Sequence, residues 1–140
     1  MFNKESQFQK YICNILDGYM KQGLIIYYFS VPNGSYFGGS YGYINMMKST
    51  GLKNGVSDLV IITKQSILFL ELKLEKGIIS DSQKSFKNMI EKTEHHYLLL
   101  KPSNLHDLES KILSELKKDS EDIISEYKTK DIFDPYKKIK

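Results

Sequence analysis

The sequence predicts one α/β domain in which a central β-sheet is flanked by helices. Two neighbouring apolar runs are typical of the arms of a β-hairpin, and amphipathic helical segments precede and follow them along the chain. The arms are apolar at consecutive positions, so we expect both of their faces to be covered, as at the centre of an α/β sheet. A hydrophobic content of 41% in 140 residues is enough for one buried core.

Each element is predicted from its own local pattern. Helices are indicated where apolar residues recur at intervals of three and four, and strands where β-branched and aromatic residues cluster between turn residues. In chain order we expect a helix over 4–22, a strand over 24–31, a glycine- and aromatic-rich loop over 33–43, a short helix over 44–50, the hairpin, a helix over 81–93, a strand over 95–101 and a helix from about 105.

The domain is expected to occupy residues 1–118. Residues 119–140 form a highly charged C-terminal extension, which we expect to be helical or frayed. The apolar stretches are shorter than the roughly 20 residues of a membrane span, and the N-terminus lacks a signal-peptide pattern. We therefore expect an intracellular protein without membrane contact.

The hairpin arms are 59–63 and 67–70, with Lys64-Gln65 as the turn. If Thr63 pairs with Ser66, then Asp58 faces Glu71 directly across the two strands. Side chains alternate along a strand, so Lys73 points to the same face as Glu71, and opposed Cβ atoms lie about 5 Å apart. Two carboxylates and an ammonium group therefore converge at one end of the hairpin.

Two carboxylates at this spacing repel each other unless one holds a proton or a cation lies between them. Oxygen ligands suit Mg²⁺ or Mn²⁺, whereas zinc prefers His or Cys at close spacing, which the sequence lacks. The alternative is a surface hairpin with an ordinary pair of Glu71 and Lys73, and the triplet alone leaves both interpretations open.

The basic residues are all lysines, and the net charge is +3. A mild excess of this kind favours an anionic partner but is common in proteins that bind no nucleic acid. Several lysines flank or follow the carboxylates: Lys48, Lys53, Lys73, Lys76, Lys84 and Lys87. The three histidines lack a paired ligand spacing and are expected to be structural.

One ordered set of residues resembles a known family. It comprises Val31-Pro32-Asn33-Gly34, Lys48, Gly51, Gly55-Val56-Ser57-Asp58, Glu71-Leu72-Lys73, Gly77, Ser80 and Gln83. The set is similar to the virus-type replication-repair nuclease (VRR-NUC) domain of the PD-(D/E)xK nuclease superfamily, from Glu5 to about Leu108. The resemblance implies a restriction-endonuclease-like α-β-β-β-α-β core with a mixed sheet. Ser57 departs from the pattern, because the family typically has proline there, which would restrict the backbone before Asp58.

The resemblance also implies roles for the converging residues. Asp58, Glu71 and the backbone carbonyl of Leu72 would be metal ligands, and Lys73 would position the attacking water or stabilise charge on the phosphate. Glu5 would complete the metal site, although a carboxylate at a helix start is favoured there by the helix dipole alone. Gln83 falls near the active site of the family, and it also fits a capping box with Ser80.

Nucleic-acid contacts are expected from the basic residues and from the loop over 33–43. Lys48, Lys53 and Lys76 would contact phosphate, although Lys53 also fits an ordinary loop position. Asn33 and Tyr36 belong to the loop, whose aromatic side chains would stack on bases. The alternative is that the tyrosines fold back onto the core or onto a dimer mate.

The function expected from the resemblance is a Mg²⁺- or Mn²⁺-dependent DNA endonuclease of a phage, virus or mobile element. Stand-alone members of the family resemble Holliday-junction resolvases, which act as homodimers on branched DNA. The alternative is a non-catalytic nucleic-acid-binding module on a nuclease scaffold. The presence of Asp58, Glu71 and Lys73 together favours the enzyme.

Overall fold

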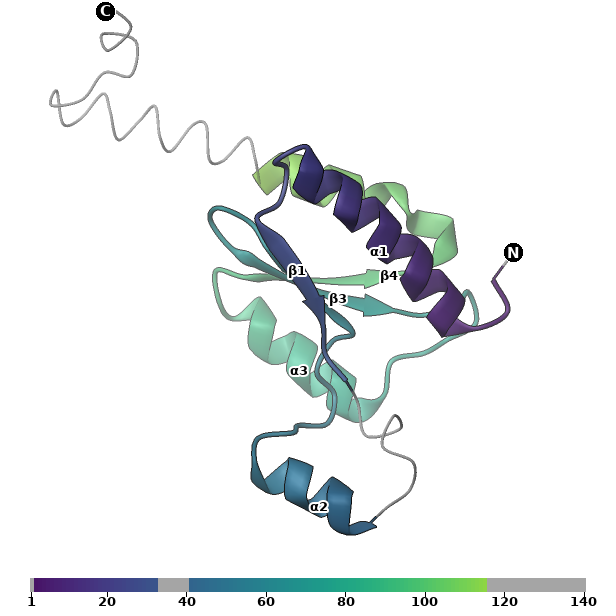
Figure 1. The fold of residues 1–140 in the computed structure, drawn as a ribbon, viewed down its shortest axis with the longest axis vertical. Coiled ribbons are helices and arrows are strands. Elements are labelled where there is room, and N and C mark those ends of the chain that lie inside the picture. Colours follow the sequence, from purple (N-terminus) through teal and green to yellow (C-terminus); the bar gives the residue numbers. More distant parts are fainter. Residues whose placement is uncertain (1, 33–40, 116–140) are drawn as a thin grey trace, which may run out of the picture.

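A mixed four-stranded sheet lies at the centre of the residues that this computed structural model describes, 2–32 and 41–115 (Figure 1). Neighbouring strands β1, β2 and β3 are antiparallel, and β4 is parallel to β3. The α/β prediction is confirmed. The strands, in order across the sheet, are β1 (Tyr27–Ser30), β2 (Leu59–Ile62), β3 (Ile67–Leu72) and β4 (His96–Leu100).

The predicted hairpin register is confirmed. Leu59 pairs with Leu70 and Ile62 with Ile67, as the Lys64-Gln65 turn requires. The turn is closed by a 2.9 Å hydrogen bond from the Thr63 N–H to the Ser66 carbonyl. The same register, continued one position before β2, sets Asp58 opposite Glu71 of β3.

The helices lie close to their predicted positions. They are α1 (Glu5–Lys21), α2 (Tyr41–Ser49), α3 (Asp81–Glu91) and a helical segment over 106–115. The first strand is shorter than the predicted 24–31, because Leu24 and Ile25 turn from α1 into the core. Its ladder nevertheless continues beyond the strand at both ends, with hydrogen bonds from Ile26 N–H to the Ile62 carbonyl and from Val31 N–H to the Asp58 carbonyl, both 2.9 Å.

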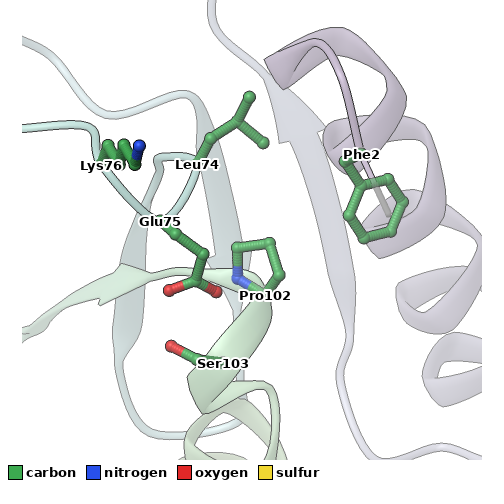
Figure 2. Close-up of a pocket in the computed structure, with 6 residues that line it drawn as sticks. All are labelled: Phe2, Leu74, Glu75, Lys76, Pro102 and Ser103. Carbon is green, nitrogen blue, oxygen red and sulfur yellow. The ribbon is translucent and has the colours of Figure 1, made fainter.

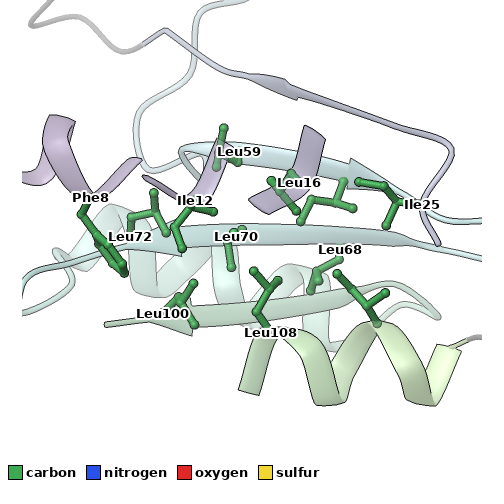
Figure 3. Packing of buried hydrophobic residues seen from close by; sticks show 12 residues of the cluster. Phe8, Ile12, Leu16, Ile25, Leu59, Leu68, Leu70, Leu72, Leu100 and Leu108 are labelled. Atoms are coloured by element: carbon green, nitrogen blue, oxygen red, sulfur yellow. The ribbon is translucent and has the colours of Figure 1, made fainter. Parts of the chain in front are cut away.

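One face of the sheet packs against α1 and the segment 106–115 (Figures 1 and 3). α1 contributes side chains at i, i+4 and i+8, the spacing of one helical face. Every second residue of β2 and β3 points into this layer, as predicted from the alternation. The buried cluster comprises Phe8, Ile12, Leu16, Ile25, Leu59, Ile61, Leu68, Leu70, Leu72, Leu100, Leu108 and Ile112.

The other face of the sheet is covered by α3, which is the crossover between the parallel strands β3 and β4. The Phe86 ring of α3 packs edge-on against Phe69 of β3 at 5.2 Å and against Tyr97 of β4 at 6.3 Å. The strand β3 is therefore covered on both faces, as its unbroken apolar run predicts.

At the hairpin-turn end, His96 and Ser66 join the sheet to the last described helix, and His95 joins β3 to the segment before β4. Glu115 is buried, accepts a 3.0 Å hydrogen bond from the Ser66 hydroxyl and lies 2.6 Å from Nε2 of His96. His95 Nδ1 accepts from the Ile67 N–H at 3.0 Å. These contacts give His95 and His96 structural roles, as expected, whereas the exposed His106 pairs with the neighbouring Asp107.

Within 2–32 and 41–115, no helix is long and apolar enough to cross a membrane. The predicted loop residues Asn33 and Tyr36 and the C-terminal extension 119–140 lie outside the described residues.

Candidate functional site

Asp58 immediately precedes β2, and hydrogen bonds hold both its side chain and its backbone. Its Oδ2 accepts a 2.8 Å hydrogen bond from the Leu72 N–H, and its carbonyl accepts from Val31. Ser57 is fully buried, and its hydroxyl donates to the Leu59 carbonyl at 3.3 Å. These bonds fix Asp58 without the restriction on φ that a proline at position 57 would supply.

Glu71 lies near the end of β3 and is only 1% exposed. Its Oε1 accepts a 2.8 Å hydrogen bond from the side-chain amide of Gln83. Its Oε2 is buried and, when both carboxylates are ionised, receives no hydrogen bond from the described residues. Burying an oxygen without a hydrogen bond costs the free energy of its lost hydration. A proton, a water molecule or a cation bound to Oε2 would remove this cost.

The two carboxyl groups affect each other's ionisation. Burial, and next the negative charge of Asp58, raise the pKa of Glu71 from 4.5 to about 8. Burial also raises the pKa of Asp58, although hydrogen bonds from the Leu72 N–H and from the protonated Glu71 carboxyl lower it. The charge of Lys73 lowers both values by less than burial raises them. Near neutral pH the free site therefore favours holding a proton, and a bound cation would replace it.

Lys73 follows β3 and directs its side chain toward the start of α1. Its Nζ lies 4.0 Å from Oε1 of Glu5, which is half exposed. Gly77 closes a turn beside it, and a Cβ at Gly77 would lie 3.1 Å from the Lys73 side chain. The absence of a side chain at position 77 gives the stem of Lys73 its space.

The roles predicted for Glu5 remain predictions. Its charge adds slightly to the rise in the pKa of Glu71. Among the described residues, no three His, Cys, Asp or Glu side chains form a group that could hold a metal ion. Glu5 thus lies beside Lys73. The side-chain oxygens that could bind a metal ion at the end of the hairpin are those of Asp58 and Glu71.

Gln83 forms the capping box predicted with Ser80 and also contacts the candidate site. Its Oε1 accepts from the Ser80 N–H at 2.7 Å and its own N–H donates to the Ser80 hydroxyl at 3.2 Å, which is the capping box of α3. Its Nε2 is then left to donate to Glu71. The capping box and the position near the candidate site are therefore compatible.

Gly55 is a site-supporting residue whose role the sequence pattern did not reveal. Its φ is +86°, and a Cβ there would lie 2.3 Å from the Ser82 carbonyl oxygen. Only glycine lets the loop before Asp58 pass this close to the first turn of α3. Close approach between segments distant in sequence leaves no signal in the local pattern.

The lysines predicted to contact nucleic acid are exposed, and none of them forms an ion pair with Asp58 or Glu71 among the described residues. Lys48 is exposed in the last turn of α2, and Lys53 is exposed in the following loop. Lys76 is exposed beside a cavity of about 520 Å³ that Phe2, Leu74, Glu75, Pro102 and Ser103 also line (Figure 2). None of the residues that line this cavity is Asp58, Glu71 or Lys73, so it is separate from the candidate site.

The donor set of the site fits a hard divalent cation. Two carboxylates with raised pKa values and one buried, unpartnered oxygen lie together, and Mg²⁺ and Mn²⁺ prefer oxygen ligands of this kind. Comparison of the chain with protein-family profiles, curated proteins and solved structures returned no match. The function is therefore argued from the geometry of the site.

Proposed function

We propose that the chain is a metal-dependent DNA endonuclease of the PD-(D/E)xK type, similar to VRR-NUC domains. The observation that carries the proposal is the buried, unpartnered Oε2 of Glu71 on β3, opposite Asp58 across the hairpin. Lys73 follows β3 directly, and its charge lowers the pKa of both carboxyl groups. The chain order of α1, the four strands and α3 supports the proposal, because the mixed sheet agrees with the restriction-endonuclease-like core that the resemblance implies.

Asp58, Glu71 and the carbonyl of Leu72 would hold the ion. A bound Mg²⁺ or Mn²⁺ would polarise a phosphoryl oxygen and make a water molecule more acidic. Lys73, only 16% exposed, supplies a fixed positive charge for the phosphate or holds the attacking water. Gln83 keeps Oε1 of Glu71 in place, which leaves Oε2 directed to the site.

Cleavage of labelled DNA tests the proposal. The purified chain is incubated with linear duplex, flap and four-way-junction DNA, with Mg²⁺, Mn²⁺ or EDTA. We expect strand scission that needs a metal and that is lost in Asp58→Asn and Glu71→Gln. Glu75→Gln is the matched control, because Glu75 is an exposed carboxylate that follows Lys73 closely and is expected to be dispensable.

Two results would contradict this function. Full cleavage by Asp58→Asn or Glu71→Gln would show that the substituted carboxylate is not needed for catalysis. DNA binding by the wild type without scission in either metal would favour the non-catalytic module instead. Equal circular dichroism spectra of the variants and the wild type are required for both comparisons.

We also propose a homodimer that prefers branched DNA. A net charge of only +3 supports weak binding to plain duplex, since few neutralised phosphates release few counterions. Selectivity would then come from shape, with the two sites of a symmetric dimer filled together by a four-way junction. Light scattering that gives a monomer, together with equal cleavage rates on junction and linear DNA, would contradict this part and leave a simple nuclease.

A further inference from the structure

Tyr97 places a second unpartnered polar atom on the carboxylate face of the sheet. Its hydroxyl is buried and has no hydrogen-bond partner among the described residues, and the same holds there for Oε2 of Glu71. The sequence pattern did not predict that Tyr97 and Glu71 lie on the same face. Their common position is a consequence of how β4 pairs with β3.

The strand register brings the two side chains to one face. Tyr97 is paired with Phe69, and Glu71 is the next residue of β3 on that face. Diagonal neighbours on adjacent strands are within reach of an aromatic side chain. Burial, and next the charges of Glu71, Asp58 and Glu91, raise the pKa of the Tyr97 hydroxyl, which is consistent with the position that the register gives it.

The packing around Tyr97 favours a polar role for the hydroxyl. Phe86 packs edge-on against its ring at 6.3 Å, so the aromatic part of the side chain is already accommodated by α3. A phenylalanine would provide the same ring without the cost of burying an unpaired hydroxyl. Two such atoms in one polar site are commonly satisfied by an ordered water molecule.

We propose that Tyr97 is a positioning residue of the carboxylate site: its hydroxyl hydrogen-bonds a water molecule that Oε2 of Glu71 also holds. With an ion in the site, this bond orders the water beside the Glu71 carboxylate. The bound water itself does not depend on the proposed nuclease function, whereas the effect on metal affinity rests on it.

The first test is a high-resolution crystal structure of the wild-type protein without metal. The expected result is an ordered water molecule within hydrogen-bond distance of both the Tyr97 hydroxyl and Oε2 of Glu71. A hydroxyl bonded directly to another protein group, or a dry gap between the two atoms, would overturn the proposal. This test gives its answer even if the chain proves to have no nuclease activity.

The second test is Mn²⁺ calorimetry on Tyr97→Phe, together with thermal unfolding in the absence of metal. We expect the affinity to fall by a factor of roughly 2 to 10, as the loss of one neutral hydrogen bond gives, with little change in unfolding temperature. Unchanged affinity, or a large loss of stability at unchanged affinity, would show a purely structural tyrosine and overturn the role.

Tyr28→Phe is the matched control. Tyr28 is also half-buried, but its hydroxyl is satisfied by Asp17 Oδ1 at 2.6 Å and by the Cys13 carbonyl at 3.1 Å, on the opposite face of the sheet. This variant should lose stability and keep its Mn²⁺ affinity. If wild-type protein binds no Mn²⁺ at all, the metal-dependent function fails, and the crystallographic test alone decides the position of Tyr97.

Discussion

The side-chain amide of Gln83 joins the start of α3 to the end of β3: its nitrogen donates to Oε1 of Glu71 at 2.8 Å, while its oxygen accepts from the Ser80 N–H at 2.7 Å. One side chain thus caps the helix and orients a buried carboxylate. Movement of the first turn of α3 would release Glu71, so the stability of the cap and the geometry of the site are linked.

The two functions of Gln83 can be separated by mutation. Ser80→Ala removes the hydroxyl of the cap but leaves the Gln83 amide, so we expect a loss of about 1 kcal/mol in the free energy of unfolding with cleavage retained. Gln83→Ala should lose both stability and cleavage. Urea unfolding and cleavage rates measure the two effects, and full activity of Gln83→Ala would contradict the link to Glu71.

The stability of the metal-free protein should depend on pH through Glu71. Its pKa is raised from 4.5 to about 8, so between these values the folded state holds a proton that the unfolded state releases. The contribution to stability is therefore complete below pH 4.5 and is lost as the pH rises through about 8. Asp58, whose pKa is also raised, acts in the same direction.

Urea unfolding across this pH range, without metal, measures the slope. In the wild type, the free energy of unfolding should decrease as the pH rises. The Glu71→Gln variant should lose most of this decrease, while Glu75→Gln should retain it. Added Mn²⁺ should stabilise the wild type more at higher pH, because the ion binds the ionised carboxylates. The same slope in the wild type and in Glu71→Gln would mean that Glu71 does not carry the effect.

Gly55 should tolerate alanine much less well than Gly51 does. Both have positive φ, +86° and +114°, but a Cβ meets the Ser82 backbone only at Gly55, and nothing lies within 4 Å of one at Gly51. Gly51→Ala should cost about 1–3 kcal/mol from backbone strain alone. Gly55→Ala should cost more and also reduce cleavage, since the first turn of α3 must shift. Equal losses in the two variants would contradict the role of close approach.

Lys73 should be needed for turnover and dispensable for metal binding. Lys73→Met keeps the stem that packs against Gly77 and removes the charge, so we expect the cleavage rate to fall by roughly 10²- to 10³-fold, as for other lost electrostatic donors. Mn²⁺ affinity by calorimetry should be largely retained, because the oxygen ligands remain. A loss of affinity as large as that of Asp58→Asn would refute this division, and Lys76→Met is the exposed control.

The hairpin and its consequences were determined by the sequence itself. Its register follows from the strand period of two and a two-residue turn, so the opposition of Asp58 and Glu71 needed no other part of the chain. The coverage of both faces was likewise visible in the apolar run over 67–70 of β3. Local rules of this kind act over a few residues and can be applied without coordinates.

Only the tertiary structure decided which distant groups meet the carboxylates. Tyr97 reaches their face because β4 pairs in parallel with β3, a register that is set by the packing of the α3 crossover and not by a turn. The approach of Gly55 to Ser82 and the bond from Gln83 to Glu71 depend on the same placement of α3. Contacts between segments far apart in sequence arise from packing, which local spacing does not encode.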